Sequence, residues 1–217
     1  MAVLAKIYLV RHGETDANRE RIIQGQLDTP LNGIGLDQSK SVARALKDIT
    51  FDLVLSSDLS RASATATAIL KHQRDLNLHQ DAELRERFMG ELQGQAVYGS
   101  AKLPMGESTI ETNHAFSTRA LTWWKKAIVD YTASLPLREE PYRILAVSHG
   151  GFISTLVRNL IHGGQLISEK VVILPSLRNV SVTTIEWDGK VWRLVKYGDA
   201  SHLSTGPLEH NVDEIRI

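Results

Sequence analysis

The sequence predicts an α/β fold, a three-layer α/β/α sandwich in which an open, mostly parallel sheet carries helices on both faces. Three observations predict it. Short apolar segments recur along the chain, each of them ends in a polar cluster, and stretches with helical periodicity alternate with them. The 217 residues contain no internal repeat, low-complexity tract or linker. We therefore expect residues 1–217 to form a single domain.

The apolar segments are short and continuous, as is typical of strands that are buried on both faces of a parallel sheet. They cover residues 7–10, 51–55 and 143–147. The helical stretches cover residues 34–46, 59–70 and 152–161. This alternation of strand and helix favours an open sheet over a barrel or a helical bundle.

Two features lie outside this alternation. Residues 180–187 and 191–197 alternate in polarity around Asp188-Gly189, a dipeptide that favours tight hairpin turns. We expect a C-terminal β-hairpin at an edge of the sheet. Residues 88–113 contain several glycines and little periodicity, which predicts a loop or short helix that forms a lid over the ligand site.

Composition excludes several classes of function. Lysine plus arginine total 25 and aspartate plus glutamate total 25, so no net charge attracts nucleic acid or an acidic membrane. The absence of cysteine excludes disulfides, thiolate catalysis and cysteine-bound zinc. No apolar segment approaches the roughly 20 residues that span a bilayer, and residues 1–6 do not resemble a secretory signal. We expect a cytoplasmic monomer or homodimer with a small-molecule partner.

Polar residues gather where the predicted strands end, and ligands of open α/β sheets bind beyond those ends. Arg11, His12 and Gly13 follow the first strand. Such a histidine can face a ligand while glycine lets the backbone approach, and the planar guanidinium suits two phosphate oxygens. Asn18 follows at a distance that lets the same loop turn back on the ligand. A strand end with a surface ion pair is the alternative for this motif alone.

Further candidates come from other parts of the chain. Gln24 and Gly25 form a second turn, and Arg61 lies in the first turn of a helix, where anions are favoured. His149 and Gly150 begin another helix. Taken singly, Arg61 could lie on a solvated helix face and His149 could be a buried structural histidine. The histidines lack the spacing of zinc pairs and no carboxylate cluster joins them, so we predict no metal.

Taken in order, these motifs resemble the signature of the histidine phosphatase superfamily. That family includes cofactor-dependent phosphoglycerate mutases, fructose-2,6-bisphosphatases and broad-range small-molecule phosphatases. The matching motifs run from Ile7 to about Phe152, and residues 179–203 resemble the end of phosphatase members. The motifs are Arg11-His12-Gly13-Glu14-Thr15 with Asn18, Ser57-Asp58-Leu59 with Arg61-Ala62, Leu84-Arg85-Glu86-Arg87 with Gly90, and Ser148-His149-Gly150-Gly151.

The resemblance implies a phosphoglycerate mutase-like fold and a phosphohistidine intermediate on His12. Glu86 would protonate the departing alkoxide and then deprotonate the attacking water, whereas the residues alone left Glu86 and Glu14 as equal candidates. The phosphoryl oxygens would be bound by Arg11, Arg61 and His149, with Asn18 and the Gly150 amide assisting. Phosphoryl transfer depends on positioning and positive charge, which we expect two arginines and an imidazolium to supply without a metal or cofactor.

Phosphatases and mutases share this intermediate, so smaller features must separate them. Family mutases carry a longer basic insertion, whereas Lys102 is the only lysine or arginine between residues 88 and 118. Residues 104–108 resemble the Pro-Gly-Gly-Glu-Ser loop of phosphatases, with Met105 replacing a glycine. Gly151 stands where mutases commonly carry asparagine. These features favour a metal-independent phosphomonoesterase, with a phosphoglycerate mutase-type phosphoryl transfer as the alternative.

The substrate is less determined than the reaction. Arg19, Arg21, Arg87 and Lys102 could meet a second anionic group at the rim, which favours sugar phosphates or phosphorylated acids, or they could be ordinary solvated charges. A non-catalytic binding module on the same fold is a second alternative. It is disfavoured because His12, Arg61, Glu86 and His149 are all present.

Overall fold

The computed structural model describes residues 2–73, 75–97, 108–168 and 176–203. Its strands are β1 (Ala5–Arg11), β2 (Leu53–Ser56), β3 (Leu78–Gln80), β4 (Tyr142–Ser148), β5 (Leu166–Ile167), β6 (Val182–Trp187) and β7 (Trp192–Asp199). Within this part of the chain they form one sheet in the order β3-β2-β4-β1-β6-β7-β5. The pairs among β1, β2, β3 and β4 are parallel, whereas β6 runs antiparallel to β1 and β7.

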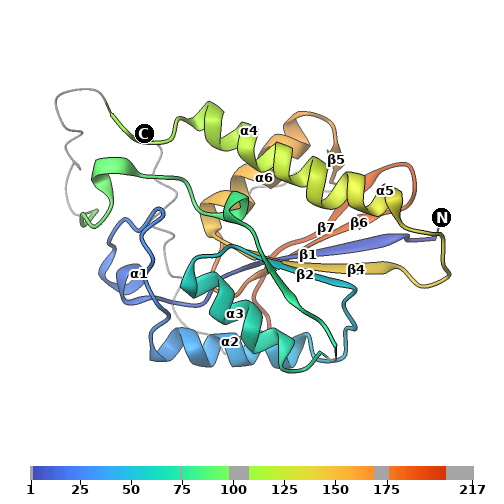
Figure 1. Cartoon of the computed structure of the whole chain (residues 1–217), viewed down its shortest axis with the longest axis horizontal. Coiled ribbons are helices and arrows are strands. Elements are labelled where there is room, and N and C mark those ends of the chain that lie inside the picture. Colours follow the sequence, from blue (N-terminus) through green and yellow to red (C-terminus); the bar gives the residue numbers. More distant parts are fainter. Residues whose placement is uncertain (1, 74, 98–107, 169–175, 204–217) are drawn as a thin grey trace.

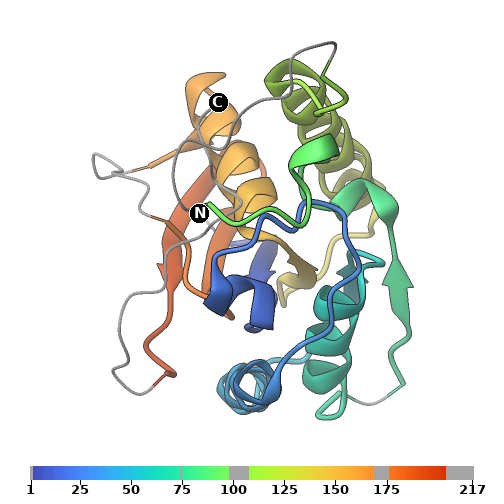
Figure 2. The ribbon, with the colours of Figure 1, turned by 90° about the vertical axis from the view of Figure 1, so that its left-hand side faces the viewer.

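Helices cover both faces of this sheet. They are α1 (Asp16–Glu20), α2 (Gly33–Ala45), α3 (Ser60–Leu70), α4 (Asn113–Trp124), α5 (Tyr131–Ser134) and α6 (Gly150–His162), and a π-helical segment (Lys125–Asp130) joins α4 to α5. Helices α2 and α3 lie on one face, and α4 and α6 lie on the other (Figures 1 and 2). The predicted three-layer sandwich is confirmed. Among the described helices, none is both long and apolar enough to cross a membrane.

The central strands β1 and β4 divide their side chains between two cores. Ile7 and Ile144 point into the core beneath α4 and α6, whereas Val10 and Leu145 pack with α2 and α3. All four are fully buried. Continuous apolar strands are required here because both faces of a parallel sheet are covered by helices.

The predicted C-terminal hairpin is confirmed as β6 and β7, but its predicted place at the edge of the sheet is wrong, because β5 lies beyond β7. The Asp188 carboxylate accepts the amides of Lys190 and Val191, and Gly189 adopts a φ of +90° in the turn. The sheet extends one strand beyond the hairpin, because β5 pairs in parallel with β7. A strand of only two residues is too short to show a periodic pattern in the sequence.

The segment predicted as a lid contains a short 3₁₀ turn (Gly90–Leu92). Met89 and Leu92 pack with Ile23 in a small separate core. Residues 98–107, which include Lys102 and most of the loop at 104–108, lie outside the described residues. The lid therefore stays a prediction.

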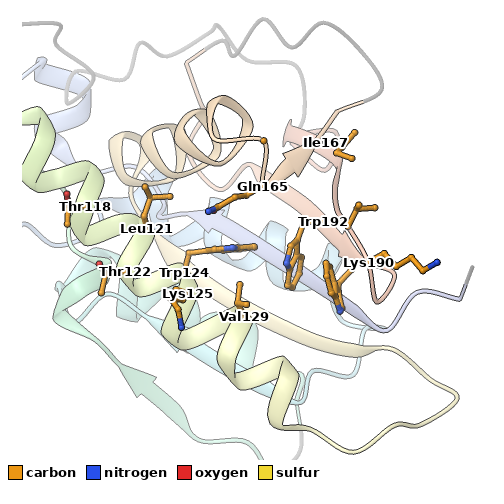
Figure 3. Close-up of a pocket in the computed structure, with 13 residues that line it drawn as sticks. Thr118, Leu121, Thr122, Trp124, Lys125, Val129, Gln165, Ile167, Lys190 and Trp192 are labelled. Atoms are coloured by element: carbon orange, nitrogen blue, oxygen red, sulfur yellow. The ribbon is translucent and has the colours of Figure 1, made fainter.

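Trp124, Trp187 and Trp192 gather at the end of the sheet where β1 begins, because Trp187 pairs with Ala5 and Trp192 pairs with Trp187. Trp123 and Trp124 of α4 are each 2% exposed, which fits core packing rather than stacking on nucleic-acid bases. Trp124 lies edge-on to Trp192, with ring centroids 5.0 Å apart, and Trp187 stacks on Trp192 at 4.9 Å. Trp124, Trp187 and Trp192 line a cavity of about 710 Å³ between α4 and the hairpin (Figure 3).

A close backbone contact joins α2 to the loop that follows β1. A Cβ atom on Gly35 would lie 2.0 Å from the carbonyl oxygen of Glu14, and one on Gly13 would lie 2.5 Å from the carbonyl oxygen of Gly35. Asn32 caps α2 by accepting the Gly35 amide, and it donates to the Glu14 carboxylate at 2.7 Å. The loop carrying His12 is thus set by main-chain contact with α2.

Gly35→Ala should therefore destabilise the fold by about 1 to 3 kcal/mol, because the new methyl group must displace the loop backbone. Gly33→Ala is the matched control, since a Cβ atom there meets nothing within 4 Å. The control should be neutral or slightly stabilising, because alanine is a better helix former than glycine. Urea unfolding of both variants measures the difference. Equal free energies of unfolding would mean that the contact is not constraining.

Candidate active site

The carboxyl ends of β1, β2 and β4 lie level with one another. Arg11 pairs with Ser148, and Ser56 pairs with Val147. The ladder continues beyond the strands, because the His12 amide donates to the Ser148 carbonyl at 2.9 Å. This register brings together the polar clusters that the sequence places far apart.

The imidazole of His12 is held in one tautomer by its own loop. Nδ1 lies 2.6 Å from the carbonyl oxygen of Gly13. A carbonyl oxygen only accepts, so Nδ1 carries the hydrogen, and in the neutral ring Nε2 keeps its lone pair. Burial, then the charges of Arg61 and Arg11, hold the pKa of His12 well below its ordinary value, while the Gly13 carbonyl opposes them.

His149 lies beside His12, with ring centroids 5.1 Å apart and the rings inclined at 61°. Its Nε2 lies 2.9 Å from the hydroxyl oxygen of Ser57. Its Nδ1 is buried and has no hydrogen-bond partner among the described residues. The pKa of His149 is lowered well below its ordinary value, chiefly by burial and then by the charge of Arg61. Both imidazoles are therefore neutral at neutral pH, which corrects the expectation that one of them is an imidazolium.

Arg11 and Arg61 are almost completely buried at the same strand ends. Arg11 donates to the carbonyl oxygen of Leu177. Arg61 donates to the carbonyl oxygens of Gly25 at 2.8 Å and Leu27 at 2.7 Å. Gly25 has a φ of +50°, a conformation that glycine adopts without strain. The turn predicted at Gly25 thus wraps the guanidinium of Arg61.

The loop at α1 brings the predicted Asn18 and Gln24 into the same network. Thr15 caps α1 in a capping box with Asn18, in which each side chain bonds the other residue's amide. The Thr15 hydroxyl also donates to Gln24 Oε1 at 2.9 Å. Asn18 Nδ2 is buried without a hydrogen-bond partner among the described residues. Asn18 therefore keeps a donor available, whereas the contact between Gln24 and Thr15 serves the loop.

Two residues of the site were given no role by the sequence reasoning. Ser57 contacts His149, and Asn179 Nδ2 donates to the carbonyl oxygen of His12 at 3.0 Å. The next residue, Val180, has a φ of +53°, which is strained for a β-branched side chain. Ser57 lies within one of the family motifs. Asn179 follows no local pattern, and the only sequence signal for Asn179 was the resemblance of residues 179–203 to phosphatase members.

Glu86 is fully buried at the N-terminus of α6. Its Oε2 accepts the Gly151 amide at 2.8 Å, and its Oε1 accepts the Arg87 amide at 2.9 Å. A Cβ atom on Gly151 would lie 2.4 Å from Oε1, so glycine is needed for this approach. Gly150 is the first residue of α6, where amides lack partners within the helix. The carboxylate thus lies against the first turn of α6, the helix that follows His149.

Glu14 has a different role in the structure. Its carboxylate accepts from Asn32 at 2.7 Å and from Arg19 at 3.1 Å, which ties the His12 loop to α2. The sequence alone left Glu14 and Glu86 as equal candidates for a proton donor. Glu14 serves the loop, and Glu86 is the carboxylate held at the first turn of α6.

This cluster of two arginines, two neutral imidazoles and helix N-termini is suited to a tetrahedral anion. Among the described residues, no three imidazole or carboxylate side chains gather in a way that could hold a metal ion. The profile of the histidine phosphatase superfamily, branch 1, matches residues 7–200. The chain belongs to this superfamily.

Its similarity to individual members extends over most of the chain. A phosphoglycerate mutase-like protein of Arabidopsis thaliana is 33% identical, over 94% of this chain and 90% of its own length. A broad-specificity phosphatase of Saccharomyces cerevisiae is 28% identical, over 99% and 93%. A phosphoglycerate mutase structure from Bacillus anthracis superposes with a TM-score of 0.73 at 26% identity, over 93% and 96%. Membership of the superfamily and these relatives support an enzyme with phosphatase or mutase activity.

The two buried histidines predict a pH dependence of stability. In the unfolded chain they bind protons as the pH falls through about 6.5, whereas in this histidine phosphatase fold their lowered pKa values keep them neutral. The unfolded state then binds more protons. The free energy of unfolding should therefore fall below about pH 6.5, by up to about 1.4 kcal/mol per pH unit for each histidine.

His149→Gln removes one of the two contributions. Between about pH 7.5 and about pH 5.5, the free energy of unfolding of this variant should fall less steeply than that of the wild type. Urea unfolding at constant ionic strength measures both slopes. Parallel slopes would contradict a neutral, buried His149.

Proposed function

We propose that this protein is a metal-independent phosphomonoesterase that hydrolyses small phosphorylated metabolites through a phosphohistidine on His12. One observation carries the proposal. The Nδ1 hydrogen of His12 is bound to the Gly13 carbonyl, so the neutral ring presents Nε2 as a nucleophile among buried arginines. A lowered pKa keeps that nitrogen unprotonated at neutral pH.

The phosphoryl oxygens would be bound by the groups around His12. Asn18 Nδ2 is a buried donor without a hydrogen-bond partner among the described residues. The Ser57 hydroxyl can donate its hydrogen to His149 Nε2, and this direction would place the hydrogen of His149 on Nδ1. Asn18 Nδ2 and His149 Nδ1, together with the guanidinium groups of Arg11 and Arg61, would stabilise the charge of the transition state.

Glu86 would be the acid and base of the reaction. In the first step the phosphorus–oxygen bond to the alcohol breaks as the bond to His12 Nε2 forms, and the alcohol oxygen takes a proton from Glu86. In the second step Glu86 takes a proton from water, whose oxygen displaces His12 from phosphorus. The backbone bonds from Arg87 and Gly151 hold the carboxylate in one place for both steps.

Hydrolysis is favoured over mutase chemistry by the contact between Gly151 and Glu86. Mutases commonly carry asparagine at the position of Gly151, and here a Cβ atom would lie 2.4 Å from the Glu86 carboxylate. A mutase must also retain a bisphosphate, which requires additional cations near the site. The names of the relatives include both activities, so they do not decide between them.

Small phosphorylated substrates, such as sugar phosphates or phosphorylated acids, remain the proposed class. Two of the rim arginines already have partners within the chain. Arg19 pairs with Glu14 at 3.1 Å, and Arg87 Nε donates to the Glu111 carbonyl at 2.7 Å. Neither is therefore required as the partner of a second anionic group, which supports a broad rather than a bisphosphate-specific preference.

His12→Ala should lower kcat by at least about a thousandfold, because no other side chain can take the place of the nucleophile. With labelled substrate and excess chelator, acid quenching of the wild type should trap a phosphoenzyme that is labile in acid. The variant should give none. A label that survived acid but was lost in base would identify a serine or threonine nucleophile, and strict dependence on added magnesium or zinc would refute the metal-free mechanism.

Glu86→Gln should impair an alkyl ester such as β-glycerophosphate far more than p-nitrophenyl phosphate. The alkoxide needs a proton as it leaves, whereas the activated phenolate does not, and general acid catalysis contributes about a hundredfold or more. Arg61→Ala is the control, because it should weaken both substrates in the same proportion. The ratio of the two kcat/KM values is the measurement. An unchanged ratio in Glu86→Gln would remove Glu86 as the acid.

A further inference from the structure

Arg119 of α4 reaches the segment that carries Glu86. Its Nη1 donates to the carbonyl oxygens of Glu83 at 2.7 Å and Arg85 at 2.8 Å, and its Nη2 donates to that of Glu86 at 3.2 Å. We propose that Arg119, held by Glu111, is a positioning residue that sets the orientation of the Glu86 carboxylate. The inference rests on the proposed function, in which Glu86 transfers the proton.

The geometry of the chain explains why these contacts act on the side chain of Glu86. The carbonyl of Arg85 belongs to the peptide unit before the Glu86 Cα atom, and the carbonyl of Glu86 belongs to the unit after it. Planar peptide units leave only two soft torsions at a Cα atom. One guanidinium that binds both units therefore limits both torsions and fixes the direction in which the Glu86 side chain leaves the backbone.

The same contacts reach the carboxylate itself. Glu86 Oε1 accepts the Arg87 amide, and that amide lies in the peptide unit whose carbonyl Arg119 binds. A rotation of this unit would move the amide away from the carboxylate. The other carboxylate oxygen, Oε2, accepts the Gly151 amide, which belongs to α6 and not to the loop that carries Glu86. Correct placement of the carboxylate requires the loop and α6 to keep their relative position.

Glu111 fixes Arg119 in turn. Its carboxylate accepts Arg119 Nε at 3.0 Å and Nη2 at 2.8 Å, a two-bond arrangement that only the planar guanidinium can form. The side chains of this pair are each 15% exposed, so solvent screens the pair weakly. Phe116 lies beneath the guanidinium, with its ring centroid 4.9 Å away. These contacts restrict the orientation of the guanidinium.

Glu111 also binds the loop directly, beyond Glu86. Its Oε2 accepts the Phe88 amide at 3.0 Å, its amide donates to the Phe88 carbonyl at 2.8 Å, and its own carbonyl accepts Arg87 Nε at 2.7 Å. Glu111 and Arg119 thus hold the backbone from Glu83 to Phe88 on both sides of the proposed acid.

A purely structural cross-link is the competing explanation, and the chain contains a matched control for it. Arg138 makes the same kind of contact far from the site. It binds Asp52 with two bonds, at 2.8 and 2.6 Å, and donates to the carbonyls of Glu140 at 2.8 Å and Pro141 at 3.1 Å. Loss of Arg138 removes an ion pair and carbonyl contacts without touching the Glu86 segment.

Arg119→Lys keeps the charge but loses the planar fork, and it is the variant least prone to misfolding. Misplacement of a catalytic group by about 1 Å costs about a hundredfold. We expect kcat/KM for β-glycerophosphate to fall by about that factor, and that for p-nitrophenyl phosphate to fall by less than about tenfold. Arg138→Lys should leave the ratio of the two values unchanged. Urea unfolding of both variants reports their losses of stability.

The double variant Arg119→Lys with Glu86→Gln separates the two hypotheses. If Arg119 acts through Glu86, Arg119→Lys should no longer change the ratio of alkyl to aryl kcat/KM once Glu86 is replaced. If Glu86→Gln changes the ratio and Arg119→Lys does not, or if both arginine variants change it alike, the positioning role is wrong and the proposed function stands. If Glu86→Gln itself leaves the ratio unchanged, the proposed function fails.

Discussion

The parallel register of β1 and β4 is the constraint on which the site depends. Arg11 opposite Ser148 makes the two strands end at the same level, and the His12 amide continues the ladder to the Ser148 carbonyl. A shift of one residue would turn every side chain of β1 to the other face. Ile7 and Val10 would then enter the wrong cores, so the packing that stabilises the sheet also places His12 beside His149.

Burial of positive charge is the second constraint. Arg11 and Arg61 are buried where an anion is expected to bind, and a buried guanidinium without hydrogen-bond acceptors would be costly. The chain supplies main-chain carbonyls, those of Leu177 for Arg11 and of Gly25 and Leu27 for Arg61. Carbonyl dipoles satisfy some of these donors without cancelling the charge, which preserves the attraction for phosphate. The same charges, together with burial, lower the pKa values of His12 and His149.

The sequence predicted those features that follow from local patterns. Apolar segments and their polar ends predicted the central strands, and the resemblance placed Arg61, Glu86 and His149 at one site. The edge strand β5 was missed, because two residues carry no period. Asn179 had no role assigned from the residues, because its contact with the His12 carbonyl joins positions that only the folded sheet brings together. Glu14 and Glu86 could not be separated by residue type, since both are acids near glycine and arginine.

Backbone contacts rather than side-chain pairs hold the proposed acid and the proposed nucleophile, so the positions that tolerate substitution least are those where the main chain approaches closely. The Glu86 carboxylate is bound by two amides, and His12 by a carbonyl. Such contacts depend on where the main chain lies, so the strict requirements fall on residues that allow close approach. Gly35 lets α2 touch the His12 loop, and Gly151 lets Glu86 reach α6. Glycine at these positions is therefore as much a part of the proposed chemistry as the charged side chains that it admits.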